Sequence, residues 1–215
     1  MSPKLPVKQE NELSIGAIVL CGGKSRRMGS SKAWLQFGKE RLLQRITQKL
    51  AAVVKNIVVV ASPHQELPVL NEKIEVLRDE FPDQGPLSGM YSGLKRLAEQ
   101  QVHFAYVTAC DCPFLKTEFI QFLIDQLDNK TQIVLIDDGN FKHVLSAIYS
   151  TTAHLTARQL MEQGKFRPLA LTESHSTKLI AVDEMRCVDA ELQSLINLNS
   201  PSDYEAALTR FNNPC

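Results

Sequence analysis

Residues 16–32, GAIVLCGGKSRRMGSSK, decide the fold of this chain. The stretch opens with an apolar, partly β-branched run (residues 17–20), which is typical of a buried parallel strand. Two glycines follow at once and allow backbone N–H groups to approach a ligand closely. Because ligands bind at the carboxyl ends of strands in α/β proteins, the stretch predicts a site for a polyanion such as a triphosphate. The cationic side chains that would meet this polyanion come next: Lys24, Arg26, Arg27 and Lys32.

Neither of two common phosphate loops matches this stretch. A P-loop places a second glycine five residues after its first. In this chain, Arg27 stands five residues after Gly22, and Met28 stands five residues after Gly23. The dinucleotide fingerprint G-x-G-x-x-G has Lys24 in place of its second glycine. A plain turn followed by a solvated cationic surface is the competing interpretation. The clustering of the cations, with Lys32 at a fixed spacing from the turn, favours the phosphate site.

Strand and helix patterns alternate along the rest of the chain. Such alternation indicates an α/β fold with a mainly parallel sheet and helices on both faces, to which residues 133–182 add an antiparallel edge. Ser200, Pro201 and Asp203 suit the start of the last helix. The sequence predicts strands at residues 57–61, 74–77, 104–108, 133–136, 144–149 and 179–182, and helices at residues 42–54, 87–98, 117–127, 152–162 and 201–211.

Length and composition exclude several classes of protein. The 215 residues suit one domain, expected at residues 14–215 after a disordered tail at residues 1–13. The 24 basic and 24 acidic residues balance, which argues against binding of nucleic acid or an anionic membrane through a large positive field. The five cysteines follow no metal-ligand or disulfide spacing and indicate free thiols in the cytoplasm. The sequence shows no signal peptide and no apolar run of roughly 18 residues that could span a membrane.

Three further segments follow predicted strands and carry candidate site residues. Asp79 is placed to accept hydrogen bonds from a base or a ribose, with a loop or capping aspartate as the alternative. Gly85 and Pro86 begin a helix whose N-terminus presents N–H groups to the pocket, although an ordinary helix start would also use the proline. Asp111, beyond a buried strand, is placed to hold Mg²⁺ with substrate phosphates, and a turn aspartate is the alternative.

Four segments are informative together, at residues 20–32, 78–90, 110–114 and 196–204. They resemble the molybdenum cofactor guanylyltransferase family, which has the three-layer, Rossmann-like fold of the nucleotidyltransferases. The first segment matches many nucleotidyltransferases, whereas the last is narrower and points to this family. The resemblance implies transfer of GMP from GTP to molybdopterin, release of pyrophosphate, and delivery of the product to molybdoenzyme apo-proteins or their chaperones. The segments are LCGGKSRRMGSSK (residues 20–32), RDEFPDQGPLSGM (78–90), CDCPF (110–114) and INLNSPSDY (196–204).

The resemblance also implies which residues bind the nucleoside. Leu20, Cys21 and Gly22 would line the guanine and ribose side of the loop, and Gly23 belongs to the same turn. Asp79 would contact the nucleoside. The start of the helix at Gly85 and Pro86 would face the same pocket.

The same resemblance implies how the phosphates and the acceptor are held. Lys32 would contact the phosphates, and Arg27 would stabilise charge on the triphosphate. Asp111 would bind both the nucleotide and Mg²⁺. Asn197 and Asn199 would face the pterin partner or hold the loop that does. The chemistry agrees, since an ionised acceptor phosphate attacking the α-phosphorus needs positioning and charge neutralisation but none of the five histidines as a base.

Alternatives remain open at this point. Val60 stands where relatives often have asparagine, so one hydrogen bond to the nucleoside is absent or supplied otherwise. Relatives that use CTP more often place alanine before the second glycine, so Gly22 favours GTP over a molybdopterin cytidylyltransferase or a transferase acting on a sugar or lipid-precursor phosphate. A different class is a nucleotide-binding adaptor that delivers the cofactor without chemistry. The presence of both Lys32 and Asp111 argues against the adaptor, which would not need the metal.

Overall fold

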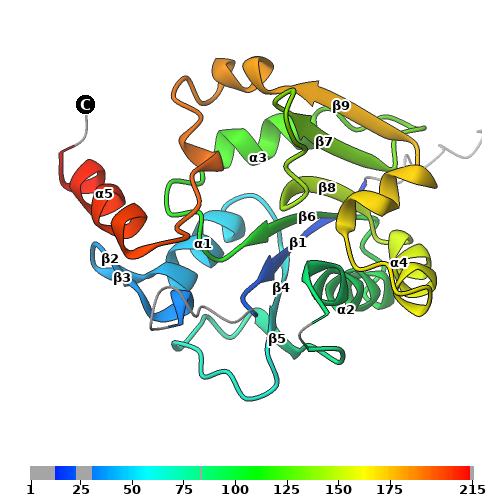
Figure 1. The fold of residues 1–215 in the computed structure, drawn as a ribbon, viewed down its shortest axis with the longest axis horizontal. Coiled ribbons are helices and arrows are strands. Elements are labelled where there is room, and N and C mark those ends of the chain that lie inside the picture. The colour runs from blue at the N-terminus through cyan, green and yellow to red at the C-terminus, as the bar shows by residue number, and fades with distance from the viewer. Residues whose placement is uncertain (1–12, 23–30, 83, 214–215) are drawn as a thin grey trace, which may run out of the picture.

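The computed structural model describes residues 13–22, 31–82 and 84–213 (Figure 1). A seven-stranded sheet with the strand order β5-β4-β1-β6-β8-β7-β9 forms its centre. The strands of this sheet are β1 (Ile15–Leu20), β4 (Asn56–Ala61), β5 (Ile74–Arg78), β6 (Phe104–Ala109), β7 (Ile133–Asp137), β8 (Ser146–Ser150) and β9 (Thr177–Ala181). The α-helices are α1 (Leu42–Ala51), α2 (Pro86–Glu99), α3 (Thr117–Ile124), α4 (Ala153–Glu162) and α5 (Pro201–Asn212).

Every strand and helix predicted from the sequence is present, with differences at their ends. Helix α1 ends at Ala51 rather than at residue 54, and α3 ends at Ile124 rather than at residue 127. The start of α5 is as predicted, because Ser200 Oγ accepts a hydrogen bond from the N–H of Asp203 at 3.2 Å. Of the predicted tail at residues 1–13, residues 1–12 are not among those that the structure describes.

The sheet is mainly parallel, as predicted, but its antiparallel strand is not at an edge. Strand β8 pairs antiparallel with both β6 and β7, and β9 pairs parallel with β7 at the edge. The physical reason lies in the two connections. The crossover through α3 places β7 so that one strand position stays open between β6 and β7. The connection after β7 is short, so the next strand, β8, can fill this position only by running antiparallel.

Helices cover both faces of the sheet and give the predicted three layers (Figure 1). Buried residues of α1 and α3 pack on one face, and those of α2 and α4 pack on the other. Within β1, Ala17 and Val19 belong to the first of these cores while Ile18 belongs to the second. Since successive side chains of a strand point to opposite faces, the unbroken apolar run of β1 is what a strand buried on both sides requires.

A smaller apolar cluster joins α5 to the segment that carries Lys32. The 3₁₀ helix η1 (Lys32–Trp34) leads into a hairpin of β2 (Gln36–Phe37) and β3 (Glu40–Arg41), which the sequence analysis did not predict. Phe37 of this hairpin packs against Phe211 of α5, with ring centroids 4.8 Å apart. Gly38 between the strands has φ +63°, and a Cβ there would lie 2.8 Å from the Phe211 ring. The C-terminal helix is thereby held beside the segment that carries Lys32.

Within the described residues, no helix combines the length and the apolar character needed to cross a bilayer.

Candidate active site

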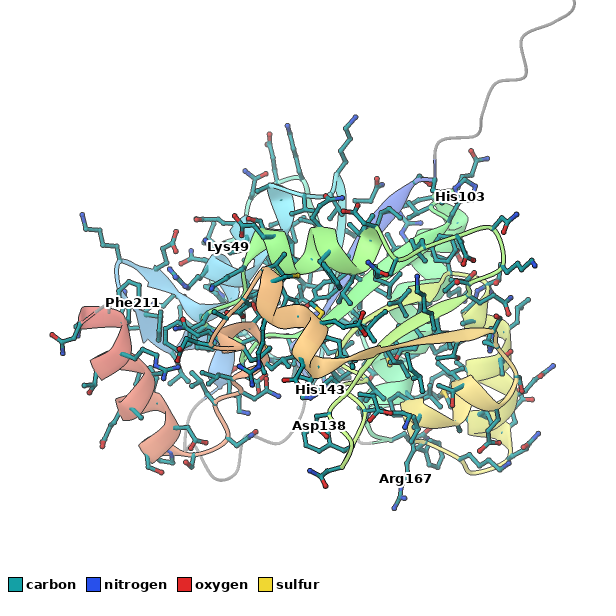
Figure 2. The ribbon with its side chains drawn as sticks, turned by 90° about the horizontal axis from the view of Figure 1, so that it is seen from above. Lys49, His103, Asp138, His143, Arg167 and Phe211 are labelled. Carbon is teal, nitrogen blue, oxygen red and sulfur yellow. The ribbon has the colours of Figure 1, made fainter. Side chains whose placement is uncertain are left out.

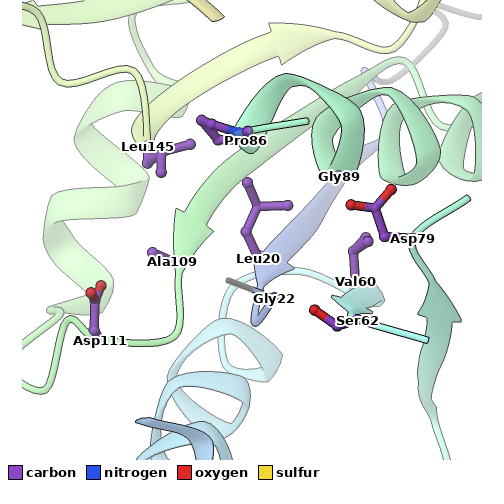
Figure 3. A pocket seen from close by; sticks show the side chains of 11 residues that line it. Leu20, Gly22, Val60, Ser62, Asp79, Pro86, Gly89, Ala109, Asp111 and Leu145 are labelled. Carbon is purple, nitrogen blue, oxygen red and sulfur yellow. The ribbon is translucent and has the colours of Figure 1, made fainter. Parts of the chain in front are cut away.

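The carboxyl ends of β1, β4, β5 and β6 surround a pocket of about 340 Å³ (Figure 3). Its volume is typical of a small-molecule site. Leu20 ends β1, Ala109 ends β6, and Asp79 follows β5. The structure therefore brings together segments that the sequence analysis had singled out separately. The pocket is lined by Leu20, Gly22, Val60, Ser62, Asp79, Gly85, Pro86, Gly89, Ala109, Asp111 and Leu145.

Asp79 is held rigidly at one wall of this pocket. Its Oδ1 accepts the N–H of Phe81 at 3.0 Å, and its Oδ2 accepts the hydroxyl of Ser88 at 2.9 Å. A carboxylate oxygen has more than one acceptor direction, so both oxygens can still accept from a ligand. Asp79 is therefore a fixed pair of acceptors that faces the pocket (Figure 3).

The N-terminus of α2 forms a second wall. Gly85 is the N-cap residue with φ +80°, which glycine adopts without strain, and Pro86 occupies the first turn. One helical turn later, a Cβ on Gly89 would lie 3.0 Å from Cδ2 of Leu20. Glycine at this position allows α2 to lie close to the end of β1. The positive end of the helix dipole is consequently placed at the pocket, where it favours an anion.

Lys32 and Asp111 form an ion pair at the pocket. Lys32 Nζ lies 2.6 Å from Asp111 Oδ2, and the two side chains are only 18% and 10% exposed. The cation compensates a carboxylate that is largely withdrawn from water. Lys32 Nζ also donates to Asn199 Oδ1 at 3.3 Å. Lys32 and Asp111, singled out in separate segments of the sequence, are thus in direct contact.

The C-terminal segment with the two asparagines lies beside Asp111. The N–H of Leu198 donates to the Asp111 carbonyl at 3.0 Å, and the Cys112 thiol donates to Asn197 Oδ1 at 3.1 Å. The N–H of Asn199 donates to the Asp203 carboxylate at 2.9 Å. Neither asparagine lines the 340 Å³ pocket, so both lie next to this pocket rather than within it.

Some predicted residues are placed differently or lie outside the described part of the chain. Cys21 follows Leu20 but its side chain packs into the core beneath α1 and α3, since consecutive side chains point to opposite faces. Cys21 is not among the residues that line the pocket. Gly23 and Arg27 fall within residues 23–30, which the structure does not describe. Their roles stay predictions.

The buried thiols of Cys110 and Cys112 have pKa values raised above the ordinary value and are protonated at neutral pH. Burial, with the nearby Asp111 carboxylate, raises the pKa of Cys112 to about 12. A hydrogen bond with Cys21, together with burial, raises the pKa of Cys110 well above its ordinary value. A protonated thiol is neither a strong nucleophile nor a metal ligand. In the described part of the chain, no three His, Cys, Asp or Glu side chains are grouped as a metal-binding cluster.

His143 lies next to Asp138 in the connection between β7 and β8 (Figure 2). Its Nε2 is 3.4 Å from Asp138 Oδ2. Burial lowers the pKa of His143 below 6.5, and the attraction of Asp138 only partly opposes this effect. The imidazole is therefore neutral at pH 7.

Sequence reasoning missed several lining residues. Ser62 directly follows β4. The expectation that residues just beyond the carboxyl ends of strands line the site, which identified Asp79 and Asp111, applies to Ser62 as well. Leu145 precedes the antiparallel strand β8, and the rule of carboxyl strand ends therefore could not reach it. Val60 does line the pocket, and it contributes an apolar surface between Ser62 and Leu20.

Comparison with known proteins agrees with this geometry. Residues 17–177 match the model of the MobA-like NTP transferase domain. A "probable molybdenum cofactor guanylyltransferase" of Mycobacterium bovis is 34% identical over 197 residues, which cover 90% of this chain and 93% of that protein. A protein of the same name from Carboxydothermus hydrogenoformans is 30% identical over 193 residues, covering 90% and 94%.

A solved structure shows the same fold. Molybdopterin-guanine dinucleotide biosynthesis protein A from Archaeoglobus fulgidus superimposes with a TM-score of 0.74 at 22% identity, covering 90% of this chain and 97% of the other. The family match spans most of the sheet and the pocket described above. The chain therefore belongs to the MobA-like NTP transferase family of nucleotidyltransferases.

Proposed function

We propose that this protein transfers GMP from GTP to molybdopterin and releases pyrophosphate. The observation that carries the proposal is the Lys32–Asp111 ion pair, which joins the nucleotide pocket to the segment with Asn199. An adaptor without chemistry has no need for such a pair beside its ligand. The names of the relatives at 34% and 30% identity support the same activity.

The nucleoside would bind against Asp79. Guanine presents two adjacent N–H donors on its Watson–Crick edge, and a carboxylate with two available oxygens can accept both. Cytosine has one exocyclic amine and cannot make the same pair. The apolar surfaces of Leu20 and Val60 would pack against the base, and Ser62 adds a hydroxyl at this wall. This arrangement favours GTP over CTP.

The phosphates would lie between the N-terminus of α2 and Lys32. Asp111 would hold Mg²⁺, since a buried carboxylate beside a phosphate site suits an ion that takes one or two carboxylates plus phosphate oxygens, and the ion would neutralise charge on the reacting phosphates. Lys32 would move from Asp111 to the phosphates and stabilise the charge that develops during transfer. Arg27 is proposed to add a second positive charge. The acceptor phosphate would attack already ionised, so the reaction requires no general base.

The acceptor would approach from the side of Asn197 and Asn199. Both amides lie next to Asp111, and Asn199 reaches Lys32 directly. They would orient the pterin or its phosphate for in-line attack. We further propose a cytoplasmic location, because the four described cysteines are free thiols. Transfer of the product to molybdoenzyme apo-proteins or their chaperones is a further proposal, and it rests on the family resemblance.

The test is a pyrophosphate-release assay with molybdopterin, Mg²⁺ and each of the four nucleoside triphosphates. GTP is expected to give the fastest release, and Asp111→Ala is expected to lose about 10²–10³ in rate, by analogy with the loss of one preorganised transition-state contact. Asp183→Ala serves as the control, because its side chain is 83% exposed.

Other outcomes would identify the alternatives. Faster release with CTP would indicate a cytidylyltransferase. GTP binding without pyrophosphate release would indicate the adaptor. Near-normal activity of Asp111→Ala would remove the proposed metal ligand.

A further inference from the structure

One side chain, that of Gln65, contacts both Cys21 and Ser31. Gln65 lies in the connection between β4 and β5. Its Nε2 donates to the carbonyl of Cys21 at 3.0 Å and to the hydroxyl of Ser31 at 3.1 Å. Cys21 directly follows the residue that ends β1, and Ser31 directly precedes Lys32. A single amide therefore ties the end of the first strand to the start of the catalytic lysine segment.

The chemistry of these contacts fixes the orientation of the amide. The Cys21 carbonyl can only accept, so the NH₂ group of Gln65 must face it. The Oε1 atom then accepts the N–H of Ser62 at 3.2 Å. Both amide hydrogens and the amide oxygen are thus used. An isosteric carboxylate would keep the contact to Ser62 but would place an oxygen against the Cys21 carbonyl.

Gln65 is itself anchored to the sheet. Nη1 of Arg78, the last residue of β5, donates to the Gln65 carbonyl at 2.7 Å and to the Ser62 carbonyl at 3.2 Å. The turn that carries Gln65 is therefore bound to the ends of two strands. Such an anchor holds a side chain in one position more precisely than a loop can alone.

A neighbouring contact holds the other side of Lys32. The indole Nε1 of Trp34 donates to the Glu66 carbonyl at 3.0 Å. Lys32 lies between Ser31, which Gln65 contacts, and Trp34. The backbone of Lys32 is consequently fixed on both sides by two consecutive residues of the β4–β5 connection.

We propose that Gln65 is a positioning residue of the nucleotidyl transfer reaction. Gln65 does not line the nucleotide pocket, so it acts through the residues that it contacts. By tying Cys21 to Ser31, it sets the position of Lys32 relative to Asp111 and to the end of β1. The inference rests on the proposed function, because its consequence is the placement of Lys32 for charge stabilisation.

The first test measures the position of the lysine segment without any substrate. Trp34 is the only tryptophan of the chain, and it is 39% exposed, so its fluorescence reports on this segment. Gln65→Glu is expected to increase acrylamide quenching of Trp34 and to shift its emission to longer wavelength. Ser31→Ala, which removes one of the two ties, is expected to do the same to a smaller extent. Gln48→Glu on the exposed surface of α1 is the matched control.

The second test measures kcat for pyrophosphate release. Gln65→Glu is expected to lower kcat by about 10²-fold, the cost of a misplacement of roughly 1 Å, while the thermal midpoint stays near that of Gln48→Glu. If Gln65 acts through Lys32, adding Gln65→Glu to Lys32→Ala lowers kcat no further. A residue with a merely structural role would instead lower kcat by the same factor in both backgrounds.

The two tests separate failure of this inference from failure of the proposed function. A wild-type protein that releases no pyrophosphate would refute the function, and the Trp34 measurement would still decide whether Gln65 holds the segment. Unchanged Trp34 quenching in Gln65→Glu would overturn the inference. An active wild type with unchanged kcat in Gln65→Glu, or with equal losses in both backgrounds, would overturn it as well.

Discussion

The proposed nucleoside half and the proposed phosphate half of the site are built in different ways. The nucleoside half uses residues that directly end or follow neighbouring strands, such as Leu20, Ser62 and Asp79. The phosphate half depends on contacts between distant segments, because Lys32 meets Asp111 across 79 residues and Asn199 across 167 residues. The first half follows from the sheet alone. The second half exists only when the hairpin and α5 are packed in place.

This difference predicts that substitutions in the phosphate half act mainly on kcat, whereas those in the nucleoside half act mainly on KM. Charge on the phosphates develops in the transition state, while the base is held equally before and during the reaction. Steady-state kinetics of matched variants in the two halves tests this difference between kcat and KM.

Lys32→Met is expected to have the largest effect. It keeps the length of the side chain but removes the charge, and kcat should fall by about 10²–10³. Pyrophosphate release measures the loss, with Lys55→Met on the exposed surface as the control. A change confined to KM would place Lys32 in ground-state binding and contradict the comparison.

Asp79→Asn is expected to have the next largest effect. The amide replaces one acceptor by a donor, and the loss of a paired contact to guanine, worth about 1–3 kcal/mol, should raise the KM for GTP by roughly 10- to 10²-fold. The preference for GTP over the other triphosphates should narrow with little change in kcat. Titration of each triphosphate by thermal shift checks this, and unchanged selectivity would show that Asp79 does not read the base.

Ser88→Ala should have a smaller effect in the same direction. It removes the hydroxyl that donates to Asp79 Oδ2 at 2.9 Å. A hydrogen bond of this kind contributes about 0.5–1.5 kcal/mol, so the KM for GTP should rise by only a few-fold. Ser202→Ala, exposed in α5, is the control. A loss as large as that of Asp79→Asn would mean that Ser88 contacts the nucleotide itself.

The smallest predicted effect concerns pH and stability. The folded protein disfavours the proton on His143, because burial lowers its pKa below 6.5 and outweighs the attraction of Asp138 and Asp137. The unfolded chain therefore binds more protons as pH falls through 6.5, and the free energy of unfolding decreases there. Replacement of His143 by glutamine should remove the part of this decrease in the free energy of unfolding that the imidazole causes. Urea titrations between pH 7.5 and roughly 5.5 measure it. A steeper decrease in His143→Gln would contradict the assignment.

The sequence was sufficient for the nucleoside half because a one-dimensional pattern determines it. Apolar runs predict where strands end, and the residues beyond those ends share one edge of a parallel sheet. Asp79 and Gly85 were predicted in this way and line the pocket, and the same rule predicted Asp111 of the phosphate half. The same rule predicted nothing about Leu145, since β8 runs in the opposite direction.

For the phosphate half, the sequence predicted which residues take part but not how they contact one another. Lys32 was named from the cation cluster, Asp111 from the end of a strand, and Asn199 from the resemblance. No spacing in the chain indicates that the ammonium group of Lys32 contacts both of the others. The hairpin of β2 and β3 is too short to give a pattern, and Gln65 has no local signature. These features arise from tertiary packing, which local propensity does not encode.

The most direct test of the account is a crystal structure with a non-hydrolysable GTP analogue and Mg²⁺. The account predicts guanine against Asp79, the triphosphate at the N-terminus of α2, and Lys32 Nζ displaced from its position 2.6 Å from Asp111 Oδ2 toward the phosphates. An analogue seated instead in the cavity of about 640 Å³ between α1 and β5 would contradict the account. So would a nucleotide in the predicted pocket that leaves the Lys32–Asp111 pair intact and makes no contact with Asp79.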